Sequence, residues 1–119
     1  MLDNFPLSKG HTLVVPKRHI TDLSELKDSE KLDVFNTIAK VEKALMETIG
    51  CEGTDLRQHF RPFLPETQLS IRHVHFHVIP RGYNDELFMR AMKYQRSIRQ
   101  RLSSKEKKDM GIRILKNLE

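Results

Sequence analysis

The most regular pattern of apolar positions lies between residues 29 and 49, where apolar side chains recur every three to four residues. This spacing places them on one face of a helix. Asp28 or Ser29 is expected to cap the start of that helix, and Gly50 stands where the left-handed residue that ends a helix belongs. The pattern therefore predicts a helix over about 29–49.

Shorter apolar runs predict the strands of a sheet. Residues 11–15, HTLVV, are rich in β-branched side chains and end at Pro16. Residues 54–60 are a weaker candidate, and residues 71–79 form a strand that Pro80 is expected to end. Alternation within this last strand predicts a core-facing row of three side chains: Val74, Phe76 and Val78.

The remaining part of the chain is expected to be helical. Residues 86–102 fit a helix, and a final amphipathic helix is predicted to start at Ser103 or Ser104. Its apolar stripe consists of Met110, Ile114 and Leu118. The elements together predict an α+β fold, in which an antiparallel sheet carries a long packed helix and a C-terminal helix follows.

Composition and charge narrow the classes of protein that fit. The 119 residues suit one domain, and the single cysteine, Cys51, cannot form an internal disulfide, which fits a reducing compartment. No apolar run approaches the roughly 20 residues of a membrane span, so we expect a cytoplasmic protein. Residues 81–119 hold 11 Lys/Arg against 5 Asp/Glu. With few aromatic residues beside them, a solvated helix surface is favoured over a nucleic-acid site.

Three of the six histidines alternate within five positions, at His73, His75 and His77. On a strand they would share the face opposite the core row. Three interpretations are open: a polar face that happens to use histidine, a metal site completed by His11 or His59, or chemistry on a phosphate. In the last, one neutral imidazole attacks phosphorus while its neighbours donate hydrogen bonds. The spacing does not separate the metal site from the phosphate chemistry.

Two blocks of the sequence resemble the histidine triad (HIT) superfamily. Residues 73–79, HVHFHVI, match its signature of three histidines alternating with apolar residues, and residues 6–26 resemble the segment that carries a fourth active-site histidine, here His11. The resemblance implies a HIT-like fold and a homodimer. It also implies a nucleotide hydrolase or transferase that cleaves at the α-phosphate of a purine nucleotide conjugate, either a phosphoramidate or a dinucleoside polyphosphate.

The resemblance also implies roles for the four histidines. His75 is the nucleophile and forms a covalent nucleotidyl-histidine, which water or another acceptor then resolves. His73 orients the nucleophile through its main chain, while His77 and His11 contact the phosphate. No metal and no cofactor are implied, because the imidazoles are expected to supply the positive charge.

Three further positions are implied to bind substrate. Asp3 matches the acidic residue that holds the ribose hydroxyls, and Ser70 matches a position that contacts the leaving group. Leu69 stands where a glutamine commonly lines the phosphate site, and Gln68 or His59 is the expected substitute.

The chain departs from the common pattern at its start, because most members have an N-terminal hairpin before the first matched block. We therefore expect a HIT domain over residues 1–82 that lacks this hairpin, and a basic, mostly helical extension of the same domain over 83–119. With no CxxC present, no structural zinc is expected and His19 is interpreted as a surface residue. The incomplete pocket keeps a second hypothesis open, a nucleotide-binding module without catalysis, and a histidine metalloprotein is a third.

Overall fold

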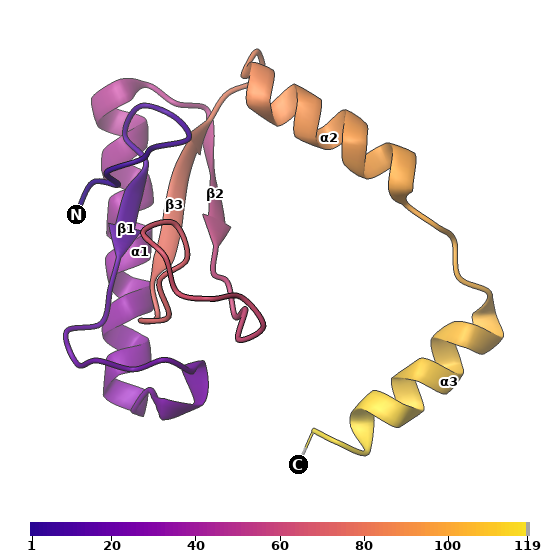
Figure 1. Ribbon diagram of the computed structural model, residues 1–119. Helices are drawn as coiled ribbons and strands as arrows, with labels where there is room; N and C mark the ends of the chain where they lie inside the picture. The colour runs from indigo at the N-terminus through magenta and orange to yellow at the C-terminus, as the bar shows by residue number, and fades with distance from the viewer. Residues whose placement is uncertain (119) are drawn as a thin grey trace. The chain divides into compact units, whose positions relative to one another are not determined.

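The structure is a computed structural model that describes residues 1–118 (Figure 1). Its contacts divide the chain into two units, the first formed by Met1–Asp85 and the second beginning at Glu86. The first unit contains β1 (Thr12–Val14), a 3-10 turn (Leu23–Glu25), α1 (Asp28–Ile49), β2 (Gly53–Arg57) and β3 (Phe76–Arg81). The second contains α2 (Glu86–Ile98) and α3 (Ser104–Leu115).

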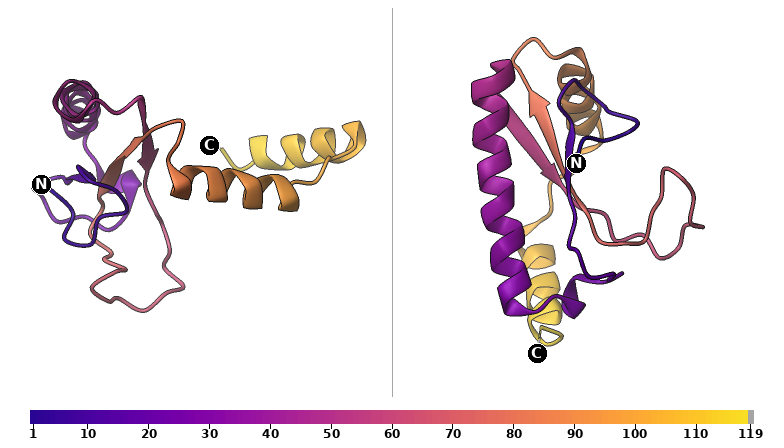
Figure 2. Two further views of the ribbon diagram at one scale, coloured as in Figure 1. Left: turned by 90° about the horizontal axis from the view of Figure 1, so that it is seen from above. Right: turned by 90° about the vertical axis from the view of Figure 1, so that its left-hand side faces the viewer.

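The sheet of the first unit is antiparallel, with β3 in the centre between β1 and β2. Leu13 of β1 and Arg57 of β2 both lie opposite His77 of β3. Helix α1 runs along one face of this sheet (Figure 2). The predicted α+β fold, with an antiparallel sheet and a long packed helix, is therefore confirmed.

The core lies between α1 and the sheet. The predicted core-facing row is confirmed, since Val74, which precedes β3, and Phe76 and Val78 within it are 2%, 5% and 0% exposed. They pack with apolar residues from β1, the following loop and α1, which are Val14, Ile20, Leu26, Val34, Ile38 and Leu45. Burial of this layer on one face of β3 leaves the opposite face for the histidines.

The prediction of a strand over 71–79 was wrong at both ends. β3 begins at Phe76, because its two partners pair only with residues 76–81, although Val74 still donates its N–H to the carbonyl of Ile20 at 2.8 Å. Pro80 lies inside the strand. Its carbonyl accepts the Ser8 hydroxyl at 3.1 Å, on the side where β1 has already ended, so no ladder partner needs the missing N–H.

The predicted helices are confirmed with small changes at their ends. Lys27, and not Asp28 or Ser29, precedes α1, and the Glu30 carboxylate accepts its N–H at 3.0 Å. Gly50 ends the helix with a φ of 66°, as predicted. The second helix stops at Ile98, before its predicted end at 102.

The final helix begins as predicted. The Ser103 side chain caps α3 and forms a reciprocal capping box with Glu106. No residue of α2 or α3 is buried, and the predicted apolar stripe of α3 is exposed. No helix within residues 1–118 is long and apolar enough to cross a bilayer.

Candidate functional site

The imidazole of His75 has one nitrogen held by its own chain. Its Nδ1 lies 2.8 Å from the main-chain carbonyl oxygen of His73. A carbonyl can only accept, so Nδ1 carries the hydrogen and the lone pair of the neutral ring is on Nε2. The contact therefore fixes the tautomer that a nucleophilic Nε2 requires.

A main-chain amide determines the tautomers of two further rings, His11 and His77. The N–H of Leu7 donates to Nδ1 of His11 at 3.1 Å, so the hydrogen of the neutral His11 ring is on Nε2. That nitrogen lies 2.9 Å from Nδ1 of His77 and donates to it. The hydrogen of His77 is consequently on Nε2, where it is available as a donor. This chain of contacts is the Leu7–His11–His77 relay.

The first residues of the chain bring a carboxylate to this relay. Asp3 donates its N–H to the carbonyl of His11 at 2.9 Å, which ties the N-terminal segment beside β1. One carboxylate oxygen of Asp3 lies 3.4 Å from Nε2 of His11 and 3.8 Å from Nδ1 of His77. The other accepts the N–H of Phe5 at 2.8 Å. Asp3 is thus a fixed acceptor at the edge of the histidine cluster.

Burial favours the neutral form of His11, His59 and His77. Desolvation, followed by the nearby rings of His75, His11 and His59, lowers the pKa of His77 to about 4. Burial also lowers the pKa of His11, against the opposing effect of Asp3, and the pKa of His59. These three imidazoles are neutral at pH 7 and act as hydrogen-bond donors or acceptors. The expectation that the imidazoles supply positive charge to a bound phosphate stays a prediction, because a phosphate beside these rings would raise their pKa values.

An arginine of β2 also lies beside the histidines and is paired with Asp55. Arg57 lies opposite His77 in the β2–β3 register, and its charge contributes to lowering the pKa of His11 and His59. Sequence reasoning missed Arg57, because its place beside His77 depends on a strand register that the weak pattern of residues 54–60 does not specify.

A buried arginine continues the same face of β3. Arg81 is 7% exposed, with Nε 3.1 Å from the Asp55 carboxylate and Nη1 2.8 Å from that of Asp85. Sequence reasoning missed Arg81 as well. The two-residue alternation of a strand would have found it, since it follows His77 by four positions.

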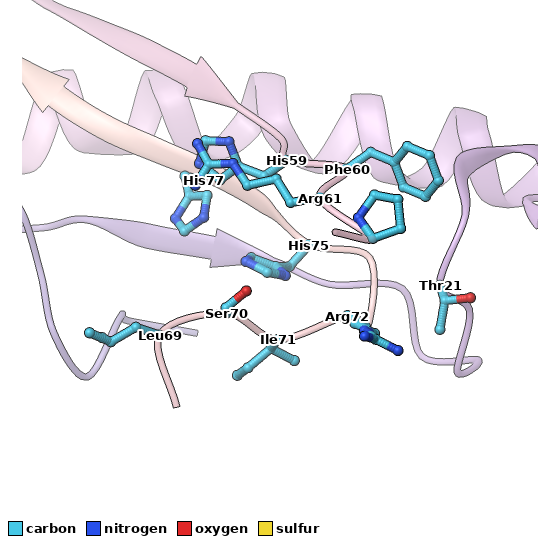
Figure 3. A pocket seen from close by; sticks show the side chains of 11 residues that line it. Thr21, His59, Phe60, Arg61, Leu69, Ser70, Ile71, Arg72, His75 and His77 are labelled. Atoms are coloured by element: carbon cyan, nitrogen blue, oxygen red, sulfur yellow. The ribbon is translucent and has the colours of Figure 1, made fainter. Parts of the chain in front are cut away.

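A cavity of about 250 Å³ opens over His75 and His77 (Figure 3). Two loop segments line its walls, one containing His59 and Arg61 and the other residues 69–72. Ser70, predicted to contact the leaving group, lies in this wall.

The other predicted substrate residues line other hollows beside His75. Asp3 and Gln68 line two of them, of about 180 and 290 Å³, together with that ring. The structure therefore gathers the predicted substrate residues around His75.

The side chain of His73 is directed to the loop after β1. Its Nε2 donates to the Pro16 carbonyl at 3.1 Å, and its Nδ1 lies 2.9 Å from Nδ1 of His19. His19 is exposed, as interpreted from the sequence, but its ring packs edge-on against His73. The hydrogen bond from the ring of His75 goes to the main chain of His73.

One group of three possible metal ligands occurs within residues 1–118. Asp3, His11 and His77 place one ligand atom each within 4.8 Å of one another. The predicted alternative used His73 and His75 instead, whose rings each hydrogen-bond a main-chain carbonyl. In the Asp3 group the two ring nitrogens that face each other are joined by a hydrogen bond, so an ion would have to displace that bond. The arrangement fits hydrogen-bond donation better than metal coordination.

The fold and the histidine cluster define a class of protein. The sequence model of the HIT domain matches residues 1–84. The chain is 39% identical over 80 residues to an adenosine 5'-monophosphoramidase of Schizosaccharomyces pombe, a match that covers 67% of this chain and 55% of that protein. An asymmetrical bis(5'-nucleosyl)-tetraphosphatase of the same organism is 30% identical over 80 residues, a match that covers 67% of this chain and 42% of that protein. The chain belongs to the HIT domain family.

Solved structures agree with the fold. A HIT family protein from Bacillus anthracis superposes with a TM-score of 0.68 at 22% identity, covering 99% of this chain and 79% of that one. A HIT-like protein from Bartonella henselae superposes with a TM-score of 0.62 at 29% identity, covering 71% of this chain and 63% of that one. The chain spans about half the length of the curated relatives it matches. Those relatives include nucleotide hydrolases.

Proposed function

We propose that this chain is a nucleotide hydrolase or transferase that cleaves at the α-phosphate of a purine nucleotide conjugate. The observation that carries the proposal is the 2.8 Å contact between His75 Nδ1 and the His73 carbonyl, which leaves Nε2 of His75 with its lone pair beside the cavity. The named relatives support the substrate class, since one is a phosphoramidase and another a tetraphosphatase.

The proposed reaction has two displacements at phosphorus. Nε2 of His75 forms a bond to the α-phosphorus, and the bond from that phosphorus to the leaving group breaks, with its electron pair departing on the leaving group. Water then attacks the nucleotidyl-histidine, loses a proton to solvent or a base, and returns the electron pair to Nε2. A different acceptor in place of water makes the same enzyme a transferase.

The neighbouring groups fit the charge that develops during these steps. Nε2–H of His77 is available as a donor to a phosphate oxygen, because His11 occupies the other ring nitrogen. Asp3 lies on the side of the cluster where a ribose hydroxyl could donate to a carboxylate, and Gln68 lines the same hollow. Ser70 lines the 250 Å³ cavity, from which the leaving group would depart.

A second candidate is a nucleotide-binding module that does not turn over its ligand. Leu69, which replaces the usual glutamine, is 80% exposed and offers no polar group to a phosphate. A chain of this kind would bind a nucleoside monophosphate and form no covalent adduct. Titration with AMP or GMP, followed by an assay for turnover, separates the two candidates.

We propose the same functional division that the sequence suggested, with the nucleotide site within residues 1–82 and a basic helical extension over 83–119. The site residues described above all come from the first segment. A homodimer in the cytoplasm is proposed from the resemblance and the single cysteine. Sedimentation of the purified protein tests the dimer.

The covalent adduct is the direct test of the catalytic proposal. The protein is mixed with adenosine 5'-phosphoramidate or diadenosine tetraphosphate, quenched within one turnover, and examined by mass spectrometry for a nucleotidyl adduct on the peptide that carries His75. The adduct and turnover are expected in the wild type and in His19→Ala, a histidine variant outside the cavity. Both should be lost in His75→Ala with its circular dichroism unchanged. Unchanged turnover in His75→Ala would overturn the mechanism.

A further inference from the structure

The hollows that meet at His75 differ in charge. Two of them are lined by the carboxylate of Asp3, in one case together with Arg57. The 250 Å³ cavity is lined by no carboxylate among the described residues and by two arginines, Arg61 and Arg72. A group that enters this cavity therefore meets two permanent positive charges, since a guanidinium does not lose its proton in proteins.

The two arginines come from different segments and reach the cavity from separate walls. Arg61 lies in the segment that follows β2, next to His59, and its charge helps to lower the pKa of that ring. Arg72 lies in the segment that leads into the triad. Figure 3 shows the two segments on either side of His75.

The loop between them is braced by its own hydrogen bonds. Thr67 and Ser70 exchange two main-chain hydrogen bonds of 3.1 and 3.2 Å. One guanidinium nitrogen of Arg72 donates to the carbonyl of Leu64 at 3.3 Å, and the Glu66 carboxylate accepts the main-chain N–H of Arg72 rather than its side chain. These contacts hold Arg72 at the cavity without neutralising it.

Neither arginine is in an ion pair within the described part of the chain. The arginines that are paired there, such as Arg18, Arg57 and Arg81, each have a carboxylate within 3.1 Å. Both residues are exposed, so an anion that enters the cavity can reach their guanidinium groups. Charge-assisted hydrogen bonds from arginine to phosphate are also among the strong ones in proteins.

We propose that Arg61 and Arg72 form the subsite for the leaving group, and that this leaving group is itself a phosphate or polyphosphate. The inference rests on the proposed function and narrows its substrate to nucleotides whose α-phosphorus is bridged through oxygen to another phosphate. When Nε2 of His75 attacks, the bond from phosphorus to the bridging oxygen breaks and the electron pair stays on that oxygen. The two arginines stabilise the negative charge that appears there.

An amine leaving group would need a proton rather than a positive charge beside it. A phosphoramidate releases an amine, whose nitrogen must gain a proton as the bond breaks. Two arginines cannot supply one, because they do not titrate. They would therefore favour cleavage of a phosphate bridge over cleavage of a phosphoramidate.

Paired substrates with the same nucleotidyl group test the proposal. Rates are measured for diadenosine tetraphosphate and for adenosine 5'-phosphoramidate, with wild type, Arg61→Gln, Arg72→Gln and the double variant. We expect each single variant to lose about 10- to 100-fold in kcat/KM on the tetraphosphate and the double variant more. The kcat/KM for the phosphoramidate should change less than about threefold. This is well below the change expected when one charge-assisted hydrogen bond to the substrate is lost.

Two control variants isolate the effect of the guanidinium fork. Lys43→Gln removes one charge from an exposed position of α1 and is expected to leave both rates unchanged. Arg72→Lys keeps the positive charge but loses the planar set of guanidinium N–H donors. Its kcat/KM on the tetraphosphate is expected to lie between those of wild type and Arg72→Gln. Equal losses on both substrates in the arginine variants would overturn the proposal, as would wild-type preference for the phosphoramidate.

Binding of inorganic tripolyphosphate separates this inference from the proposed function. Calorimetry is expected to show binding to the wild type and to His75→Ala, and at least about tenfold weaker binding to the double arginine variant, as expected for a lost charged hydrogen bond. If tripolyphosphate binds in this way but neither substrate is turned over, the anion subsite stands and the catalytic proposal fails. Undiminished binding to the double variant would overturn the subsite.

Discussion

The Nδ1 atom of His75 lies 2.8 Å from the main-chain carbonyl oxygen of His73, so the orientation of the proposed nucleophile depends on the backbone of His73 and not on its side chain. We therefore expect His73→Ala to keep turnover within about tenfold of wild type, whereas His75→Ala should lose at least about 10³-fold. Steady-state rates on one nucleotide substrate make the comparison. Losses of equal size in the two variants would assign a direct catalytic role to the His73 ring.

Acid should destabilise the fold through His77. The unfolded chain takes up a proton at this residue near pH 6.5, but burial lowers the pKa of the folded state to about 4. Below pH 6.5 the unfolded state therefore binds more protons, and the free energy of unfolding decreases as the pH falls, by up to about 3 kcal/mol at pH 4. Above pH 6.5 this contribution does not change.

Urea unfolding between pH 7.5 and 4.5 checks this dependence. His77→Gln lacks the titrating group, so its stability should decrease less steeply with falling pH than that of wild type. Other groups titrate in both proteins and cancel in the comparison. Parallel curves for the two proteins would contradict a lowered pKa at His77.

The buried guanidinium of Arg81 should be essential for stability. It is 7% exposed and bridges the carboxylates of Asp55 and Asp85. Arg81→Met leaves these acidic groups without their shared partner, and we expect a loss of about 3 kcal/mol in the free energy of unfolding. Lys43→Met, which breaks an exposed pair with Glu47, should cost at most about 0.5 kcal/mol in the same urea titration. A similar small change for both variants would refute the bridge.

Gly10 positions His11 through a backbone conformation that other residues rarely adopt. Its φ is 90°, and a Cβ there would lie 2.9 Å from Cδ1 of Ile49. Gly50 also has a positive φ, of 66°, but no atom lies within 4 Å of the corresponding Cβ position. We expect Gly50→Ala to cost about 1 kcal/mol from backbone conformation alone.

Gly10→Ala should cost about 2 kcal/mol, because displacement of Ile49 adds to the same backbone strain. It should also lower turnover, since the strained turn directly precedes His11. Thermal unfolding and a rate assay of the two alanine variants provide the comparison. Equal stability losses would show that the side chain of Ile49 moves aside without cost.

The sequence pattern predicted α1 to within a residue at its start, because twenty-two residues of regular spacing and a terminal glycine agree. It placed the start of β3 five residues too early. Alternation of apolar side chains continues before Phe76, but a strand also needs partners, and the lengths of β1 and β2 limit the pairing. Those lengths are set by packing that a local pattern does not contain.

The histidines of the candidate site could be named from the sequence, but its arginines and its charge states could not. Alternation indicated a shared histidine face, and the family resemblance added His11 and Asp3. The neutral state of His77 depends on burial by the assembled fold. Arg61 and Arg72 are brought to one cavity by a loop whose two prolines and irregular pattern predict no conformation. Loop geometry and burial are tertiary properties, and so the pattern could not reveal them.

The Leu7–His11–His77 relay fixes the positions of two protons before any ligand binds. A phosphate oxygen arriving at Nε2 of His77 finds the donor already in place, so no tautomer exchange is needed and the dipoles are preorganised. The relay starts from a main-chain amide. Its direction is consequently insensitive to which side chain occupies position 7, with one exception. Proline has no amide hydrogen, and it would leave Nδ1 of His11 without a donor and free the relay to reverse.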